Sequence, residues 1–327
     1  MSAFIDKFVN FFRDHLVGRY SSLLGEIRHE WVGSDPNSKS LRIAVYVNYD
    51  KYGVIHQFVA DQVRSLAEAG FRVIFVNHSA QIRDLPSILP NCTRIFHRRN
   101  IGHDFGAYRF ALRWIRNANI QPKSVILMND SCYGFFSGIK EIHSNVEEGR
   151  ADLWGITESF EHAYHIQSYF LLLSERLISS PIFWRFWDTL PSHSNRREVI
   201  RYGEIGLTQH VLRNGFRTNV LASYSHLVEN WLSMRGRRLR KSKSEANFSE
   251  FVEGHVLTSQ PINPCHVFWE GLLEDFQAPL IKRDLFSKNP LRVPNLHKTE
   301  RILAKRGCSF RTSREHLRFA TKELRLK

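Results

Sequence analysis

The chain has 327 residues with 46 Lys or Arg against 32 Asp or Glu, a formal net charge of +14, and 43% hydrophobic residues. This composition predicts a folded globular protein and excludes disordered and collagen-like chains. Its apolar runs are far shorter than the roughly 18 residues that a membrane-spanning helix needs, and the first residues lack a secretion signal. Four cysteines without a Cys-x-x-Cys pair favour a reducing, cytoplasmic location.

The excess of positive charge predicts an anionic partner. Residues 235–243 hold six Lys or Arg and no acid, and residues 301–327 hold nine against two Glu. Neither run has the interleaved aromatics of a nucleic-acid-binding segment, so no nucleic-acid partner is expected. Polybasic segments also bind the anionic cytoplasmic leaflet, and four phenylalanines at helical spacing between residues 4 and 12 favour that surface. The alternatives are solvated basic segments and an N-terminal helix docked on the protein's own core.

Apolar strands and amphipathic helices alternate along the chain from residue 41 onwards. Strands are predicted at residues 41–48, 71–77, 93–97, 124–128, 153–157 and 166–173, and helices at 56–69, 105–117, 181–190 and 204–213. This alternation is typical of a Rossmann-like α/β fold, a mostly parallel sheet flanked by helices. The predicted parts are a helical extension (1–40), the α/β core (41–230), a basic linker (231–260) and a basic, mainly helical C-terminal region (261–327).

Polar residues directly follow several predicted strands. Asn48 ends the first strand, Asn77 ends the second, and Asn129, Asp130 and Ser131 follow the strand at 124–128. Because ligands of open parallel sheets bind beyond the carboxyl ends of the strands, these side chains are candidate ligand contacts.

The segment between the strand at 93–97 and the next helix is a candidate phosphate-binding loop. Arg98 and Arg99 precede the sequence NIGHDFG at 100–106. Its two glycines allow backbone N–H groups at a helix start to approach a phosphate closely. Ordinary turn and cap residues are the structural alternative.

Two acidic residues are candidates for chemistry. The Asp130 carboxylate at a strand end is placed to hold Mg²⁺ or Mn²⁺ on a diphosphate, with a helix cap as the alternative. Glu204 starts a predicted helix and is a candidate general base facing the same cleft, with a favourable interaction with the helix macrodipole as the alternative. His210 and His226 are candidate further metal ligands.

Five segments in this order resemble the rhamnan synthesis F family, bacterial polysaccharide glycosyltransferases commonly described as rhamnosyltransferases. They are YDKYG (49–53), RNIGHDFGAY (99–108), LMNDS (127–131), DLWGIT (152–157) and HIQSYF (165–170). The resemblance covers about residues 41–225 and continues in NPCHVFW (263–269) and PLIKR (279–283). The layout is also similar to that of family 2 glycosyltransferases, which implies a GT-A-like core.

The resemblance implies roles for individual residues. Asn100 and Gly102 match the Asn-x-Gly of the nucleotide-binding loop, and residues 129–131 occupy the place of an Asp-x-Asp metal motif. Glu204 matches the second acid of the pair that supplies the base, and Gly203 replaces the first. The implied donor contacts are Asn48, Asn77, Arg99, Asn100, Gly102, Asp104, Tyr108, Asn129, Asp130 and Ser131, and the implied acceptor contacts are His165 and Gln167.

The implied reaction transfers a sugar, rhamnose from dTDP-rhamnose, to a growing surface polysaccharide or lipid-linked glycan. Inversion requires a base on the acceptor side, here Glu204, and positive charge or hydrogen-bond donors at the leaving diphosphate. Because one acid remains in the metal motif, at Asp130, dependence on Mg²⁺ or Mn²⁺ stays open. A lipid-linked acceptor and the basic periphery predict a cytoplasmic protein, peripheral on the inner face of the membrane. The alternative is a non-catalytic membrane-associated assembly subunit that keeps the glycosyltransferase-like fold.

Overall fold

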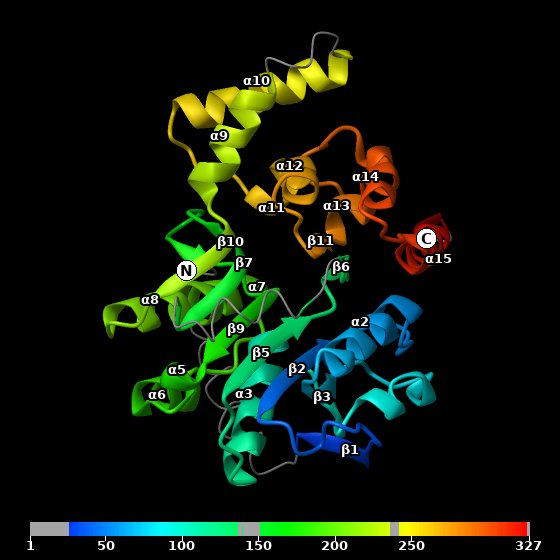
Figure 1. Cartoon of the computed structure of the whole chain (residues 1–327), viewed down its shortest axis with the longest axis vertical. Coiled ribbons are helices and arrows are strands. Elements are labelled where there is room, and N and C mark those ends of the chain that lie inside the picture. The colour runs from blue at the N-terminus through cyan, green and yellow to red at the C-terminus, as the bar shows by residue number, and fades with distance from the viewer. Residues whose placement is uncertain (1–25, 137–138, 140–150, 236–241, 326–327) are drawn as a thin grey trace, which may run out of the picture.

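A computed structural model describes residues 26–136, 139, 151–235 and 242–325 of the chain (Figure 1). Within these residues, nine strands form one sheet along the path β1-β4-β3-β2-β5-β9-β7-β10, with β8 paired to β7. In path order their bounds are Ile27–Val32, Arg94–Arg98, Arg72–Asn77, Arg42–Asn48, Ser124–Asn129, Phe170–Ser174, Leu153–Ser159 and Thr218–Ala222, and β8 is His165–Ile166. The sheet is parallel from β4 to β5 and between β7 and β10, whereas β1 and β9 run antiparallel to their neighbours. The predicted Rossmann-like α/β fold with a mostly parallel sheet is confirmed.

Helices cover both faces of the central strands. Side chains alternate between the faces of a strand, so Ile43 and Val45 of β2 pack in a core with helix α3 (His103–Asn117). Tyr46 points to the other face, into a core with helix α2 (Gln57–Glu68). Strands buried on both faces read as continuous apolar runs, which is why the sequence predicts them clearly.

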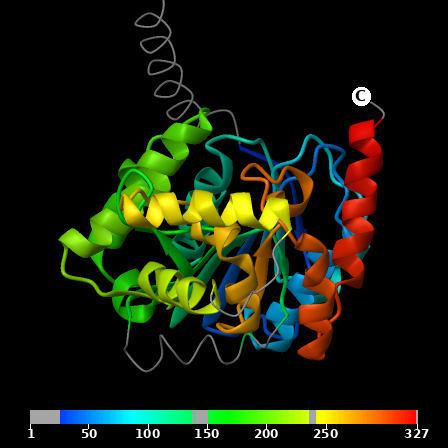
Figure 2. The same ribbon diagram turned by 90° about the horizontal axis from the view of Figure 1, so that it is seen from above.

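The other helices surround this centre, as the views from the side and from above show (Figures 1 and 2). They are α5 (Glu175–Ile178), α6 (Pro181–Thr189), α7 (Arg196–Glu198), α8 (Gly206–Arg213), α9 (Tyr224–Arg235), α10 (Lys243–Leu257), α11 (Pro264–Val267), α12 (Trp269–Glu274), α13 (Asp284–Ser287), α14 (Thr299–Lys305) and α15 (Arg311–Arg325). Short 3₁₀ turns lie at Leu85–Ser87, Leu89–Asn91 and Leu296–Lys298, and a π-helical turn, η3 (Val199–Ile205), joins α7 to α8.

A small two-stranded sheet attaches the C-terminal region to the end of β5. Strand β6 (Cys132–Gly134) follows β5 almost at once and pairs antiparallel with β11 (Leu280–Lys282), which places Lys282 opposite Cys132. Helix α15 then packs on α2 and α13. The C-terminal region therefore lies beside the carboxyl ends of β2 and β5 (Figure 1).

Two predicted parts differ from the structure. The helical extension predicted for residues 1–40 is wrong for Ile27–Val32, which forms the edge strand β1 because it pairs with β4; residues 1–25 lie outside the described residues. The linker predicted for residues 231–260 is largely helical, because α9 continues to residue 235 and a Ser242/Glu245 capping box starts α10. Residues 236–241 of the basic run lie outside the described residues.

The structure also bears on membrane insertion and cysteine chemistry. In the part of the chain that the structure describes, no helix combines the length and apolar character required to cross a bilayer. All four cysteines are thiols, and Cys92, Cys132 and Cys265 are buried.

Candidate functional site

The order of the strands creates a crevice at the carboxyl ends of β2 and β5. From β2 the chain proceeds outward to β3 and β4, and then returns to place β5 on the other side of β2. Neighbouring connections leave in opposite directions at this point, which is where open α/β sheets bind ligands. Three predicted donor contacts, Asn48, Asn129 and Asp130, lie here.

A chain of buried side chains connects β3, β2 and β5 at this edge. Asn77 Nδ2 donates to Asn48 Oδ1 (2.8 Å), and Asn48 Nδ2 donates to Asp130 Oδ2 (3.1 Å). Asp130 also accepts from the backbone N–H of Tyr49 and from Arg283 Nη1 (3.0 Å). Burial raises the pKa of the Asp130 carboxyl, and the Arg283 guanidinium opposes that rise. The sequence therefore predicted which of these polar residues meet, but not the guanidinium that pairs with them.

Asp104, Asn129 and Ser131 form a second group next to the first. Asn129 Nδ2 donates to Asp104 Oδ2 (2.8 Å), while the backbone N–H of Ser131 donates to Asn129 Oδ1 (3.1 Å). Lys282 Nζ donates to the Ser131 hydroxyl (3.1 Å). Burial, followed by the charge of Asp130, raises the pKa of Asp104 to about 6. An ammonium and carboxylates thus lie together where β5 ends.

The loop before α3 is held by its own residues. Gly102 precedes the helix with a φ of 77°, and a Cβ on Gly106 would lie 1.9 Å from the Ile101 carbonyl oxygen, so both positions require glycine. Arg98 is fully buried and donates to Glu26 (2.8 Å) and to the Ile101 carbonyl (3.0 Å). Arg98 therefore supports the loop.

The predicted donor contacts of this loop differ in exposure. Arg99 and Asn100 carry exposed side chains, whereas Tyr108 is buried on α3, where its hydroxyl is 3.4 Å from the Ser168 carbonyl oxygen. The charges of Asp104, Glu204 and Asp130 all act on Tyr108, after burial, to raise its pKa. Tyr108 thus packs beside the acidic side chains of the site.

Glu204 is largely buried and forms a pair with His165. Glu204 Oε1 lies 3.4 Å from His165 Nε2, and Oε2 accepts from the Ser168 hydroxyl (2.9 Å). His165 Nδ1 lies 2.8 Å from the Ala163 carbonyl oxygen, so Nδ1 carries a proton and Nε2 is directed at the carboxylate. Burial disfavours the charged form of both side chains. In each of them the hydrogen bond and the opposite charge of the partner outweigh burial, so the pKa of Glu204 is lowered and that of His165 is raised.

The position of Glu204 corrects one sequence expectation. Glu204 lies within the π-helical turn η3, preceded by α7, and is not at a helix start. An interaction with the helix N-terminus therefore does not account for it. Gly203 packs flat on the Phe105 ring, where a Cβ would come within 2.7 Å of a ring carbon, so no acidic side chain fits at that position.

Gln167, the second predicted acceptor contact, connects β7 to the C-terminal region. Its Oε1 accepts from the Thr157 hydroxyl (2.7 Å), and its Nε2 is 3.4 Å from Asn263 Oδ1. Asn263 begins the NPCHVFW segment. This segment thus meets the HIQSYF segment in space, next to the Glu204 pair.

Comparison with known proteins shows that part of the chain is similar to one protein family. Residues 73–234 match the model of the family described as "Rhamnan synthesis protein F". The expected resemblance to this family is thus confirmed for that part of the chain. The matched residues include Glu204, His165 and the end of β5, and the match relates this part of the chain to polysaccharide biosynthesis.

Two relatives show how similar the chain is to other bacterial proteins. The chain is 28% identical over 226 residues to the uncharacterized protein y4gN of Sinorhizobium fredii, a match that covers 65% of this chain and 59% of that protein. It is 24% identical over 263 residues to the virulence protein VirA of Vibrio anguillarum, covering 79% of this chain and 83% of VirA. The chain thus spans less than two thirds of the Sinorhizobium protein.

The residues at the end of β5 do not suit a divalent cation. Asp130 is the single acid of residues 129–131, and its carboxylate already binds a guanidinium, a carboxamide and a backbone N–H. Among the described residues, no three His, Cys, Asp or Glu side chains gather as metal ligands would. His210 lies against the Phe186 ring, with Nε2 3.0 Å from the Ile182 carbonyl oxygen, and His226 is exposed on α9.

A cavity of about 360 Å³ opens beside Arg283, between α15 and the loop that follows β2. Its walls combine aromatic and basic side chains with one acid, Asp50. The aromatic side chains are those of Tyr49, Tyr52 and Phe319, among others, and the basic ones include Lys51, Lys288 and Arg283. Volumes of this size accommodate a small organic ligand.

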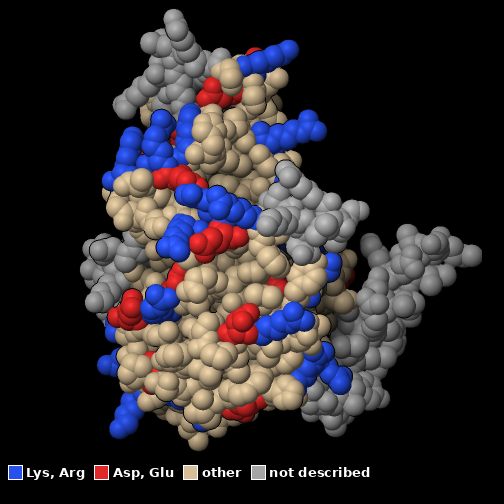
Figure 3. Space-filling view, turned by 90° about the vertical axis from the view of Figure 1, so that its right-hand side faces the viewer, with Lys and Arg blue, Asp and Glu red and all other residues tan. Residues whose placement is uncertain are grey.

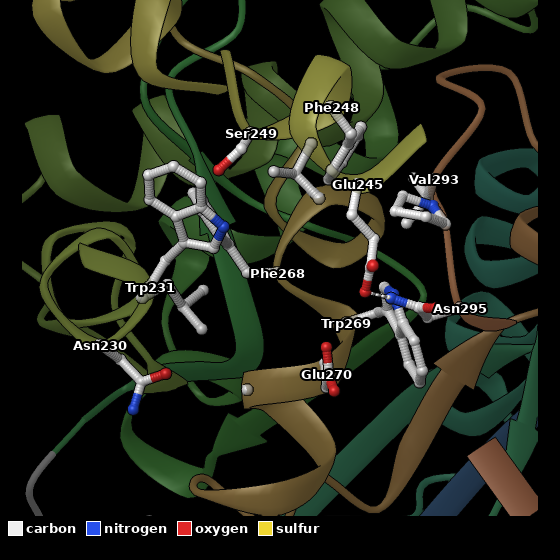
Figure 4. A pocket seen from close by; sticks show the side chains of 14 residues that line it. Asn230, Trp231, Glu245, Phe248, Ser249, Phe268, Trp269, Glu270, Val293 and Asn295 are labelled. Atoms are coloured by element: carbon white, nitrogen blue, oxygen red, sulfur yellow. Dashed lines mark hydrogen bonds between the residues drawn. The ribbon is translucent and has the colours of Figure 1, made fainter. Parts of the chain in front are cut away.

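A second cavity, of about 60 Å³, lies between α9, α10 and α12 (Figure 4). Trp231 and Phe248 line it with Glu245 and Glu270, but these carboxylates are paired with Lys298, at 3.7 and 4.0 Å. The volume suffices for a few water molecules and is too small for a sugar ring.

Sequence reasoning missed Lys282 and Arg283 as site residues. The PLIKR segment contained the signal, two adjacent cations after an apolar run, but it lies 153 residues from Asp130 in the chain. Only the β6–β11 pairing brings these cations to the end of β5.

Proposed function

We propose that the protein is a glycosyltransferase that moves a sugar from a nucleoside diphosphate to a hydroxyl of a growing glycan. The observation that carries the proposal is the buried Glu204–His165 pair at the same sheet edge as Lys282 and Asp130. Inverting transfer requires a base for the acceptor and positive charge for the leaving diphosphate. This edge of the sheet offers both, and the match of residues 73–234 to a rhamnan synthesis family supports the glycan as the product.

Glu204 is the proposed base. Its carboxylate accepts the proton of the acceptor hydroxyl while the acceptor oxygen bonds to the anomeric carbon of the donor. The bond from that carbon to the diphosphate oxygen breaks, and its electron pair leaves with the nucleoside diphosphate. His165 and Ser168 keep the carboxylate ionised and oriented, because both direct donors at its oxygens.

The donor is proposed to lie across the β2–β5 crevice, with its nucleoside in the 360 Å³ cavity. The faces of Tyr49, Tyr52 and Phe319 suit a base, and the adjacent lysines suit phosphates. The family description, which refers to a rhamnan, supports rhamnose as the sugar and dTDP-rhamnose as the donor. A GT-A-type core is supported by the parallel sheet whose polar residues gather at the ends of β2 and β5.

The acceptor is proposed to be a lipid-linked glycan at the inner face of the cell membrane. The net charge of +14 supports an anionic surface as a partner. On the side of the molecule that carries α15, Lys and Arg alternate with Asp and Glu (Figure 3), as in the Arg311–Glu315 pair. Part of the positive charge is thus balanced locally, and the attraction is expected to be moderate and sensitive to salt.

Transfer and donor-hydrolysis assays with dTDP-, UDP- and GDP-sugars test the proposal. Glu204→Gln is expected to lower turnover by about 10²–10⁴ while the circular dichroism spectrum stays native. Glu229→Gln, on the exposed face of α9, is the matched control and should leave turnover unchanged. Full activity of Glu204→Gln would refute the base. Nucleotide binding without turnover of any donor would instead favour a non-catalytic assembly subunit.

A further inference from the structure

We propose that Lys282 and Arg283 hold the donor diphosphate in place of a divalent cation, so that nucleotide binding requires no metal. The inference rests on the proposed function, since it concerns the leaving group of the same site. Two features support it: the backbone fixes both cations at the end of β5, and Arg283 occupies the Asp130 carboxylate.

The backbone anchors both cations to the end of β5. Strand β11 pairs with β6, and the N–H of Arg283 donates to the Ser131 carbonyl oxygen (2.9 Å). On the same residue, the Ser131 hydroxyl accepts from Lys282 Nζ (3.1 Å). Ring faces support the two side chains, with Lys282 Nζ 4.5 Å from the centre of Tyr169 and the Arg283 guanidinium 5.4 Å from that of Phe58. The positions of the charges are therefore set before any ligand arrives.

The two cations occupy the electrostatic place that a metal ion would take. The Arg283 guanidinium pairs with Asp130 at 3.0 Å, so the acid that would hold the metal holds a side chain. Burial disfavours the Lys282 ammonium, but Cys132 and Cys265, followed by Asp284 and Glu204, outweigh burial and raise the pKa of Lys282. An ammonium and a guanidinium together supply the same charge as one Mg²⁺. A divalent ion added beside Asp130 would meet both of them at close range, and like charges repel.

The arrangement also fits the expected course of the donor. Arg283 lines the 360 Å³ cavity and contacts Asp130, so it lies where that cavity meets the strand ends. Lys282 donates to the Ser131 hydroxyl, and Glu204 is among the charges that act on Lys282. A diphosphate that extends from the cavity toward Glu204 passes Arg283 first and then Lys282. Guanidinium and ammonium groups both bind phosphate oxygens by charge-assisted hydrogen bonds.

Calorimetric titration of the full-length protein with dTDP, UDP and GDP tests the inference, with excess EDTA in one series and MgCl₂ or MnCl₂ in the other. The expected affinity for the nucleotide that binds is the same in both series. Lys282→Met is expected to weaken nucleoside diphosphate binding by roughly tenfold or more, while binding of the matching nucleoside is unchanged. Lys305→Met, an exposed lysine of α14, is the control. If Lys282→Met does not fold, Lys282→Gln, which keeps a donor for the Ser131 hydroxyl, takes its place.

Two results would overturn the inference: loss of binding in EDTA that Mg²⁺ or Mn²⁺ restores, and unchanged diphosphate affinity in the Lys282 variant that folds. Neither result affects Glu204 as the base. By contrast, failure of every nucleotide to bind, with metal and without it, would remove the proposed function itself and the inference with it. The two failures are therefore distinguishable in one set of titrations.

Discussion

The Glu204–His165 pair makes a defined prediction for the pH dependence of activity. A carboxylate base works in its ionised form, so turnover falls as the pH drops through its pKa. Burial raises the pKa of Glu204, but the hydrogen bond and charge of His165 lower it by more. The variant His165→Gln removes the positive charge and leaves burial in place. The acidic limb of the profile is therefore expected to move to higher pH.

The size of this movement follows from the geometry of the pair. His165 Nε2 and Glu204 Oε1 are 3.4 Å apart, and the two side chains are 6% and 17% exposed. Two unit charges at that distance interact by roughly 5 kcal/mol at an effective dielectric constant of about 20. A single opposite charge at such range changes a carboxyl pKa by about 1–3 units in proteins. An upward movement of about 1–3 pH units is therefore expected.

The assay is kcat/KM against pH for sugar transfer, because this quantity reports the ionisations of the free enzyme. His226→Gln, at an exposed position of α9, is the matched control and should reproduce the wild-type profile. An acidic limb that lies at the same pH in wild type and His165→Gln would refute the role assigned to the pair. A movement to lower pH would contradict the direction of the electrostatic argument.

Three other predictions concern stability and the membrane. Gly106→Ala is expected to destabilise by about 1–3 kcal/mol in urea unfolding, since its Cβ would lie 1.9 Å from the Ile101 carbonyl oxygen; the same change at the exposed Gly254 of α10 should stabilise by about 0.5–1 kcal/mol. Asp152→Ala is expected to cost about 2–4 kcal/mol, because the buried carboxylate accepts from the Arg217 backbone N–H at 2.8 Å; an unchanged urea midpoint would contradict this. Flotation with anionic liposomes is expected at low salt and not at high salt, and protein that stays at the bottom at low salt argues against membrane attachment.

Much of the fold and part of the site could be predicted from local patterns. Strand β2 reads clearly because its buried positions from Ile43 to Val47 are all apolar, and a parallel sheet then brings strand ends to one edge. Asn48, Asn77 and Asp130 follow from that rule alone, and the structure connects them through two hydrogen bonds. Strand β1 was missed because its residues become a strand only by pairing with the edge of β4.

The cations of the site could not be placed from the sequence, because their position depends on contacts between distant segments. Arg283 is 153 residues from Asp130 in the chain and contacts it because β6 pairs with β11. The hydrophobic periodicity of the sequence does not indicate such a long-range contact. The glycine at 203 likewise looked like the loss of an acid from a motif. Its reason is steric, since the Phe105 ring of α3 fills the space where a side chain would go.

A structure of the protein with dTDP bound is the most direct test of the central claim, that the crevice between β2 and β5 holds a nucleotide donor. The account predicts the base in the 360 Å³ cavity beside Tyr49 and the diphosphate within hydrogen-bonding distance of Arg283 and Lys282. Nucleotide bound outside this edge of the sheet, or with its diphosphate turned away from both cations, would contradict it.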